Sequence, residues 1–330
     1  MKVFELIFLF VCIFKSIGSY DILAIFPHEG RSHHNVFAPV IRRLASGGHN
    51  MTVIGYYSFK VENKHFREII LEDTMKQGEY FFDLKSFVDV PWSISQAMIP
   101  FVLTDLGVRS CQVMLSNSKI QNLLKQNIKF DLILAEFFNS ECIHIFKDQF
   151  DVPLVGISAS TIMPWHNDRF GNPDNPSYIP NNHLWHEMKM NFFERVENVL
   201  GLYWHNIFYW ILTMKNQNKI ESFSERRLRL NHAKISNTSL LLANSHFSLT
   251  YPRPLVPGVI EVGGIHIEDK KMLPWIHAAN NVFFEVTASD IECIISEILF
   301  YNPTMGVGFY DPWVLVLRVR FLQIIIFDLI

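Results

Sequence analysis

Two β-prone runs flank a helical pattern near the start of the chain, and this order constrains the fold more than any other feature. The first run is YDILAIF (20–26), which the turn residues PHEGR follow. Apolar residues then recur at helical spacing from Val36 to Leu44, with Ser32 suited to the N-cap and Gly47 to the stop. NMTVIGY (50–56) is a second β-prone run. A strand, a helix and a strand in this order predict two parallel strands.

The same order returns between residues 130 and 158. FDLILAE (130–136) is a strand pattern, a polar turn follows at Asn139-Ser140, and a short helix is expected to about Phe150 before the strand PLVGIS (153–158). Repeated units of this kind predict an α/β fold with a Rossmann-like, doubly wound parallel sheet. We expect its neighbouring strands near residues 21–26, 51–56, 131–136 and 153–158.

The remaining segments are expected to be mainly helical. Residues 60–128 read as helices and loops, and their apolar stretch 91–103 is either a core helix broken by Pro100 or a patch that touches a membrane. Residues 183–232 read as two long helices, the first of them crowded with aromatic side chains. Such an aromatic stripe packs in a core or lines a pocket for an apolar ligand.

The first eighteen residues have the layout of a signal peptide. Lys2 precedes an apolar stretch from Val3 to Phe14, and small residues stand at Ser16 and Gly18. We therefore expect cleavage near Gly18 and entry into the secretory pathway, with residence in the endoplasmic reticulum, or secretion where no anchor is present. That compartment permits N-glycosylation at the two sequons of the sequence, which begin at Asn50 and Asn237.

Composition narrows the choice of partners. The chain is 49% hydrophobic and 18% charged, which indicates a globular protein rather than a disordered one. Its 29 Lys and Arg are scattered and slightly outnumbered by 32 Asp and Glu, so we expect no nucleic-acid partner. After removal of the signal peptide three cysteines remain, Cys111, Cys142 and Cys293, so at most one disulfide can form within the chain.

Three histidines, His28, His33 and His34, follow the first predicted strand within seven positions. Ligands of open parallel sheets bind outside the carboxyl ends of the strands, so this location favours a functional role. A zinc site is not expected, because His33 and His34 are neighbours that point apart on a helix. The pair His183 and His186, one helical turn apart, is followed by Glu187 and does not form the H-E-x-x-H motif of metalloproteases.

A general base fits this position better than a metal ligand. His33 falls in the first turn of the predicted helix, where the helix dipole disfavours a charged imidazolium and keeps a proton-accepting ring. Glu136 ends a predicted strand and would converge on the same sheet edge, and Glu141 is a second candidate for the carboxylate that orients the ring. The alternative is that Glu136 is a solvated loop acid and His33 a capping residue. The pattern alone leaves both interpretations open.

Three segments carry a resemblance to a known family. FPHEGRSHHNVFAPVIRRLASGGHNMTVIG (26–55), FDLILAEFFNSEC (130–142) and LLLANSHFSLTYPRPLVPGVIEVGGIHI (240–267) resemble the amino-terminal half of UDP-glycosyltransferases, most closely the insect type. The resemblance is ordered and covers about residues 20–274. It implies the amino-terminal domain of a GT-B enzyme, in which two Rossmann-like domains face each other across a cleft. Residues 19–270 would then bind the acceptor, a small lipophilic molecule.

The resemblance also implies a mechanism. His33, in the position of the family's Ser-His histidine, would deprotonate the acceptor hydroxyl, which attacks the anomeric carbon of a UDP-sugar and inverts it. The UDP-sugar is a co-substrate, and no metal or other cofactor is implied. The family's supporting acid is usually Asp, and Glu136 or Glu141 takes its place here. His28, His34 and His49 have no catalytic counterpart, and His49 is expected to shape the turn into the second strand.

Residues 271–330 depart from the family pattern and form a divergent tail in place of the UDP-sugar-binding domain. TMGVGFYD (304–311) lacks the strand and helix start of a phosphate loop. The apolar ending 312–330 carries Arg318, Arg320 and Asp328, which makes a poor membrane anchor. We therefore expect UDP-sugar binding only if a donor domain is supplied. The alternative function is that of an inactive truncated relative that binds a small lipophile or pairs, as a homo- or hetero-oligomer, with a full-length relative.

Overall fold

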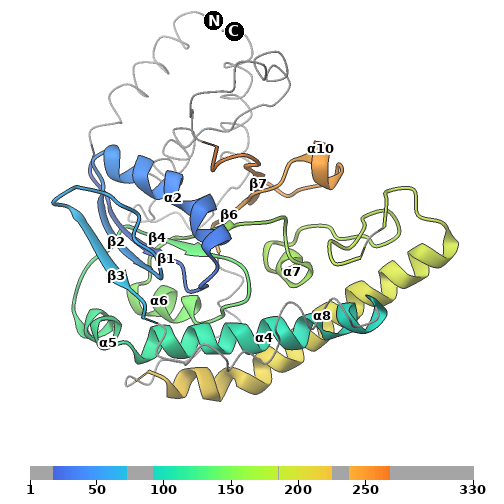
Figure 1. The fold of residues 1–330 in the computed structure, drawn as a ribbon, viewed down its shortest axis with the longest axis horizontal. Coiled ribbons are helices and arrows are strands. Elements are labelled where there is room, and N and C mark those ends of the chain that lie inside the picture. Colours follow the sequence, from blue (N-terminus) through green and yellow to red (C-terminus); the bar gives the residue numbers. More distant parts are fainter. Residues whose placement is uncertain (1–17, 73–91, 185, 225–237, 268–330) are drawn as a thin grey trace, which may run out of the picture.

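Seven parallel strands form one sheet at the centre of the protein (Figure 1). The computed structural model describes residues 18–72, 92–184, 186–224 and 238–267. The strand order is β3-β2-β1-β4-β5-β6-β7, and every neighbouring pair is parallel. The strands are β1 (Asp21–Ile25), β2 (Asn50–Gly55), β3 (Phe66–Ile70), β4 (Leu132–Glu136), β5 (Leu154–Ser158), β6 (Leu240–Ala243) and β7 (Val259–Glu261).

The predicted α/β class and the four predicted parallel strands are confirmed by β1, β2, β4 and β5. The chain order reverses between β1 and β4, because β2 and β3 extend the sheet on one side of β1 and the later strands extend it on the other. At such a switch point the loops after two neighbouring strands diverge and leave room between them. The loop after β1 and the loop after β4 therefore lie at the same sheet edge.

The description of residues 60–128 as helices and loops is wrong at β3. This strand is at the sheet edge, where only Ile69 is fully buried and polar Arg67 and Glu68 interrupt the apolar run. It pairs with β2 in the register Met51 to Phe66. A half-exposed edge strand carries no continuous apolar run, which is why periodicity did not reveal it.

Helices cover both faces of the sheet (Figure 1). Side chains of β1 alternate between two hydrophobic clusters, with Ile22 facing α2 and Leu23 facing α4 and α5. The N-cap of α2 is Gly30 rather than the predicted Ser32, whereas Gly47 ends the helix as predicted. The helices are α2 (Arg31–Ser46), α4 (Trp92–Ser116), α5 (Ser118–Lys125), α6 (Ile143–Phe150), α7 (Asn167–Phe170), α8 (Phe192–Ser222) and α10 (Phe247–Thr250), with the 3-10 turn η1 (Pro164–His166).

Helix α4 continues through Pro100, so the predicted break at this residue is wrong. Proline lacks the N–H that would bond to the carbonyl of Gln96 one turn earlier. That carbonyl accepts a hydrogen bond from His205 Nε2 of α8 at 3.0 Å, and the Ala97 carbonyl accepts one from Trp204 Nε1 at 2.9 Å. The neighbouring helix thus supplies the donors that keep α4 intact.

The two long helices predicted within residues 183–232 are a single helix in the described part of that range. Helix α8 runs 31 residues from a capping box at Asn191 and Glu194, whereas residues 183, 184 and 186–191 are not helical. Residues 225–232 lie outside the described residues. Part of α4, Ile94–Ser116, is long and apolar enough to cross a membrane by composition, which also fits a core helix.

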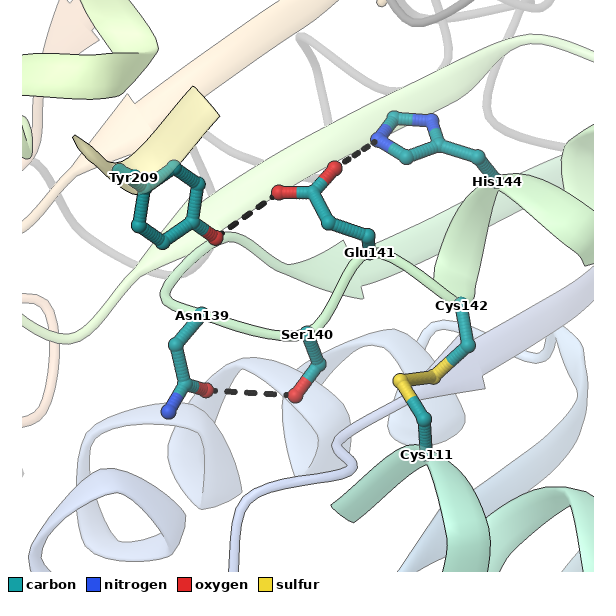
Figure 2. The surroundings of a disulfide bond; sticks show 7 residues. All are labelled: Cys111, Asn139, Ser140, Glu141, Cys142, His144 and Tyr209. Carbon is teal, nitrogen blue, oxygen red and sulfur yellow. Dashed lines mark hydrogen bonds and ion pairs between the residues drawn. A yellow bond between two sulfur atoms is a disulfide. The ribbon is translucent and has the colours of Figure 1, made fainter. Parts of the chain in front are cut away.

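One disulfide, Cys111–Cys142, joins α4 to the start of α6 (Figure 2). It agrees with the maximum of one bond that three cysteines allow, and Cys293 lies outside the described residues. The predicted signal peptide, apart from Gly18, the sequon at Asn237 and the tail 271–330 also lie outside them. Asn50 of the other sequon begins β2, and its side chain donates a hydrogen bond to Asp21 Oδ1 at 3.0 Å.

Candidate active site

The structure brings His33 and Glu136 together. His33 is the third residue of α2, directly after the turn that leaves β1, and Glu136 is the last residue of β4. Because β1 and β4 are neighbours, both side chains reach the same sheet edge, and His33 Nδ1 is hydrogen-bonded to Glu136 Oε1. A carboxylate bonded to one ring nitrogen fixes the orientation and tautomer of the imidazole.

The two partners differ in their exposure to solvent. The Glu136 side chain is 1% exposed, and its second oxygen is buried without a hydrogen-bond partner in the described part of the chain. The His33 side chain is 18% exposed, and its bond to Glu136 is the one hydrogen bond that it makes with described residues. Nε2 remains available to accept a proton.

Aromatic side chains surround the His33 ring. The centroid of His28 lies 4.4 Å from it and that of Phe138 lies 4.8 Å from it, and His28 and Phe138 are themselves 5.0 Å apart. Burial lowers the pKa of His28, with a smaller opposing effect from Glu136 and a further lowering from His33. A Cβ atom at Gly30 would lie 2.8 Å from His28 Nε2 and 3.3 Å from His33 Cδ2, so any larger residue here requires the His28 ring to move.

His34 and His49 do not join this group. The His34 ring faces away, with ring centroids 5.4 Å from Tyr57 and 4.5 Å from Phe59. Burial and then the nearby Arg42 lower the pKa of His34. His49 Nδ1 accepts a hydrogen bond from the backbone N–H of Tyr20 at 3.3 Å, beside the entry to β2. His33 and His34, which are neighbours in the sequence, therefore point apart, as their positions on a helix predicted.

Glu141 lies in a different environment and does not contact His33. Its buried carboxylate accepts hydrogen bonds from Arg169 Nη2 at 2.6 Å and Tyr209 Oη at 2.9 Å, and His144 Nε2 is 3.7 Å away. Figure 2 shows the contacts with Tyr209 and His144. Burial acts to raise the pKa of Glu141, but Arg169, His144 and the hydrogen bond outweigh it and lower the pKa to about 2. Of the two predicted acids, the structure places Glu136 beside the histidine and Glu141 in a buried ion pair.

A chain of contacts joins this ion pair to the histidine. The Tyr209 ring stacks on Trp165 with centroids 4.2 Å apart, and Trp165 Nε1 donates a hydrogen bond to the Phe138 carbonyl at 3.2 Å. Phe138 in turn contacts the His33 ring. Sequence reasoning missed Phe138, Trp165 and Arg169 and counted Tyr209 only as part of the aromatic stripe within residues 183–232, because the four residues come from separate loops and helices and form no motif.

No group of three or more His, Cys, Asp and Glu residues that could hold a metal ion occurs in the ranges that the structure describes. His183 and His186 lie in the loop before α8 rather than on one turn of a helix. The His183 ring stacks on Trp165, and burial with the neighbouring His205 lowers its pKa to about 3. His186 Nε2 lies 3.4 Å from a carboxylate oxygen of Glu197.

Comparison with known proteins adds an independent observation. The family model described as "UDP-glucoronosyl and UDP-glucosyl transferase" matches residues 22–281. UDP-glucosyltransferase 2 of Dactylopius coccus is 32% identical over 271 residues, which are 81% of this chain and 51% of that protein. UDP-glycosyltransferase UGT5 of the same insect is 32% identical over 78% of this chain and 49% of its own length. The chain thus spans about half the length of the curated relatives that it matches.

Solved structures give a weaker likeness. The structure titled as the glycotransferase of kitacinnamycin shares 13% identity and a TM-score of 0.42, over 78% of this chain and 55% of that one.

Proposed function

This chain belongs to the UDP-glucoronosyl and UDP-glucosyl transferase family, and from that premise we propose that it is the acceptor-binding half of an inverting UDP-glycosyltransferase. Residues 19–270 form the first of two Rossmann-like domains in this proposal, and the second domain binds the UDP-sugar. The observation that carries the proposal is the hydrogen bond between His33 and the buried Glu136 at the switch point of the sheet.

The proposed reaction moves a hexosyl group to a hydroxyl of a small lipophilic acceptor. Nε2 of His33 takes the hydroxyl proton while the acceptor oxygen attacks the anomeric carbon of the sugar. The bond between that carbon and the β-phosphate oxygen breaks, its electron pair leaves with UDP, and the anomeric configuration inverts. Glu136 holds the ring through Nδ1 and stabilises the imidazolium that forms, in the manner of the carboxylate in a Ser-His-Asp triad.

The surroundings of His33 support this role. Phe138 and His28 place aromatic surface beside the ring, which suits an acceptor that carries its hydroxyl on an apolar body. Because burial keeps His28 neutral, this residue does not add a second positive charge next to the base. Glu141 acts at a distance in this proposal, since its ion pair holds the loop that presents Phe138.

The proposed location is the lumen of the secretory pathway. Disulfides form and persist in oxidising compartments, and Cys111–Cys142 is such a bond between buried cysteines. The signal-peptide layout of residues 1–18 supports the same location.

The test supplies the donor half by fusing residues 19–270 to the carboxyl-terminal half of Dactylopius coccus UDP-glucosyltransferase 2. Transfer from UDP-glucose to a panel of small phenols is measured together with acceptor binding. We expect His33→Ala to abolish turnover while acceptor binding persists, and Glu136→Gln to lower kcat by at least about 100-fold, the lower end of the range for general-base catalysis.

His34→Ala is the matched control, because it removes the neighbouring imidazole from the same helical turn but on the face that points to Tyr57 and Phe59. It should leave turnover close to that of the parent. Turnover that survives His33→Ala, or that falls equally in His34→Ala, would contradict the assignment of the base.

A further inference from the structure

Helix α8 buries several polar side chains and exposes a stripe of apolar ones. The buried residues include Asn198, His205 and Thr213 beside Leu202 and Tyr209. An outer stripe of apolar side chains lies on the opposite side, at alternating spacings of three and four residues and with exposed fractions of 42–80%: Phe193, Val196, Leu200, Tyr203, Ile207 and Trp210. This arrangement reverses the usual amphipathicity of a helix on a water-soluble protein.

The outer stripe is too large to be incidental. An aromatic side chain has an area of roughly 150–250 Å². The exposed parts of the stripe, taken together with those of Trp204 and Ile211, therefore amount to on the order of 800 Å² of apolar surface. The largest apolar patch on a typical soluble monomer covers roughly 300–600 Å². Such a surface indicates a partner that removes it from water.

No charged residue interrupts this part of the helix. Residues 198–214 contain no Asp, Glu, Lys or Arg, which at 1.5 Å per residue is an uncharged length of about 25 Å. Charges return at the ends, and Lys215 and Lys219 are exposed at the carboxyl-terminal one. Exposed lysines at the border of an apolar surface can bind the phosphates of lipid headgroups.

The apolar surface continues onto α4, which lies beside α8 (Figure 1). The Phe101 ring of α4 packs against Phe208 with centroids 5.4 Å apart, and Trp204 is anchored to the α4 backbone through the Ala97 carbonyl. The first turns of α4 show a similar arrangement, since Gln96 and Thr104 are buried while Met98 and Val102 are partly exposed. The apolar surface is therefore wider than the stripe on one helix.

We propose that the outer stripe of α8 docks in the plane of a phospholipid bilayer, with its aromatic and aliphatic side chains at the boundary between headgroups and acyl chains. The breadth of the surface favours lipid over a second helix, because a coiled-coil seam is narrow and is usually flanked by charged residues. Between residues 198 and 214 the flanks are Trp204, Phe208 and Ile211, and charged Glu197 lies beside only the first turns of the stripe. Tyrosine and tryptophan are also the residues enriched at the membrane interface. This contact is independent of the proposed sugar transfer.

The test uses the full chain with vesicles of phosphatidylcholine and phosphatidylserine, in which the phosphatidylcholine carries bromine on its acyl chains and quenches nearby tryptophan. We expect brominated vesicles to quench the fluorescence of the wild type, and Trp210→Phe to remove a quenched component. Trp165→Phe is the matched control, because Trp165 is buried under Tyr209 and should contribute no quenched component. If the fluorescence that Trp210 contributes is not quenched by brominated vesicles, the proposal is overturned, even if the protein binds the vesicles.

A second comparison assigns the contact to the stripe. Leu200→Gln with Ile207→Gln should abolish quenching of Trp210, whereas Asn218→Gln, at an exposed polar position of the same helix, should preserve it. Persistent quenching in the double variant overturns the proposal. The competing occupant of the stripe is a second copy of this chain, and sedimentation of the protein without vesicles tests for it. If the wild type is a dimer, the double variant is a monomer and bromolipid does not quench Trp210, the stripe is a dimer interface and the proposal is overturned. Circular dichroism checks the folding of each variant, and the Trp210→Phe comparison stands without the double variant.

Discussion

The imidazole of His205 replaces the backbone donor that Pro100 removes from α4. Its Nε2 donates to the Gln96 carbonyl at 3.0 Å, and its Nδ1 accepts a hydrogen bond from Asn181 Nδ2 at 3.0 Å. Burial lowers the pKa of His205, although the bond to Gln96 opposes this, so the ring is neutral and has one donor and one acceptor nitrogen. Both nitrogens are thereby satisfied.

We expect His205→Leu to destabilise the protein by about 2–4 kcal/mol, because it leaves two buried polar groups without partners. In a Pro100→Ala background the residue at position 100 has its own N–H for the Gln96 carbonyl, so the cost of His205→Leu should fall by about 1–2 kcal/mol. Urea unfolding of the four proteins in this double-mutant cycle measures the coupling. Equal costs in both backgrounds would exclude the compensation between Pro100 and His205.

Gly30 should control the alignment of the base. Its φ of −62° is open to any residue, but a Cβ atom would come within 3.0 Å of the His28 ring. Gly30→Ala is therefore expected to displace His28 and His33 and to lower kcat/KM of the completed enzyme by about tenfold or more, as a small misplacement of reacting groups does. The thermal unfolding midpoint should change little. A variant with unchanged kinetics would show that the two rings relax without cost to catalysis.

Glu141 should make stability depend on pH in the acid range. Its pKa is about 2 in the folded protein and about 4.5 in the unfolded chain, so the unfolded chain binds the proton first as pH falls. The stability that Glu141 contributes is therefore complete above about pH 4.5 and is lost as pH falls toward 2, at up to about 1.4 kcal/mol per pH unit. The free energies of unfolding of the wild type and of Glu141→Gln should differ most near neutral pH and converge below pH 4.5. A difference that stays constant between pH 6 and 3 would contradict the assigned ion pair.

Loss of the disulfide should be costly because it closes a loop of considerable length. Cys111 and Cys142 are 31 residues apart in the sequence, and the chain-entropy model gives about 3–4 kcal/mol for such a loop. Cys111→Ala with Cys142→Ala should lower the free energy of unfolding by about this amount. Dithiothreitol should lower the stability of the wild type toward that of the double variant and leave the variant unchanged, which separates the bond from the packing of the two side chains.

The sequence revealed four strands and missed the short buried strand β6 as well as the strands at the two edges of the sheet. Strands β1, β2, β4 and β5 carry apolar runs bounded by turn residues, whereas β3 is half-exposed and β7 has three residues. The inverted pattern of α8 also resisted periodicity analysis, since apolar spacing indicates a helix face but not which face is covered. Tertiary contacts with α4 and the preceding loop decided that question.

The contact between His33 and a carboxylate was predicted up to the choice of the acid. His33 and the two acids follow strand ends, so their convergence on one sheet edge could be inferred from topology. Which acid meets the histidine depends on how the loop after β4 turns, and that turn is held by Arg169, Tyr209 and Trp165. These residues are remote in sequence and contribute no local signal.

The hydrogen bond between His33 and Glu136 joins residues 103 positions apart, and this separation ties the site to the folding of the chain. During synthesis β1 and α2 emerge first, and the ring of His33 has no oriented partner until β4 pairs with β1. Strands β2 and β3 and helices α4 and α5 lie between the two partners, so their contact is among the most non-local in the sheet and is expected to form late. The base is therefore oriented in the same step that completes the centre of the sheet, and a partly folded chain carries an unaligned histidine.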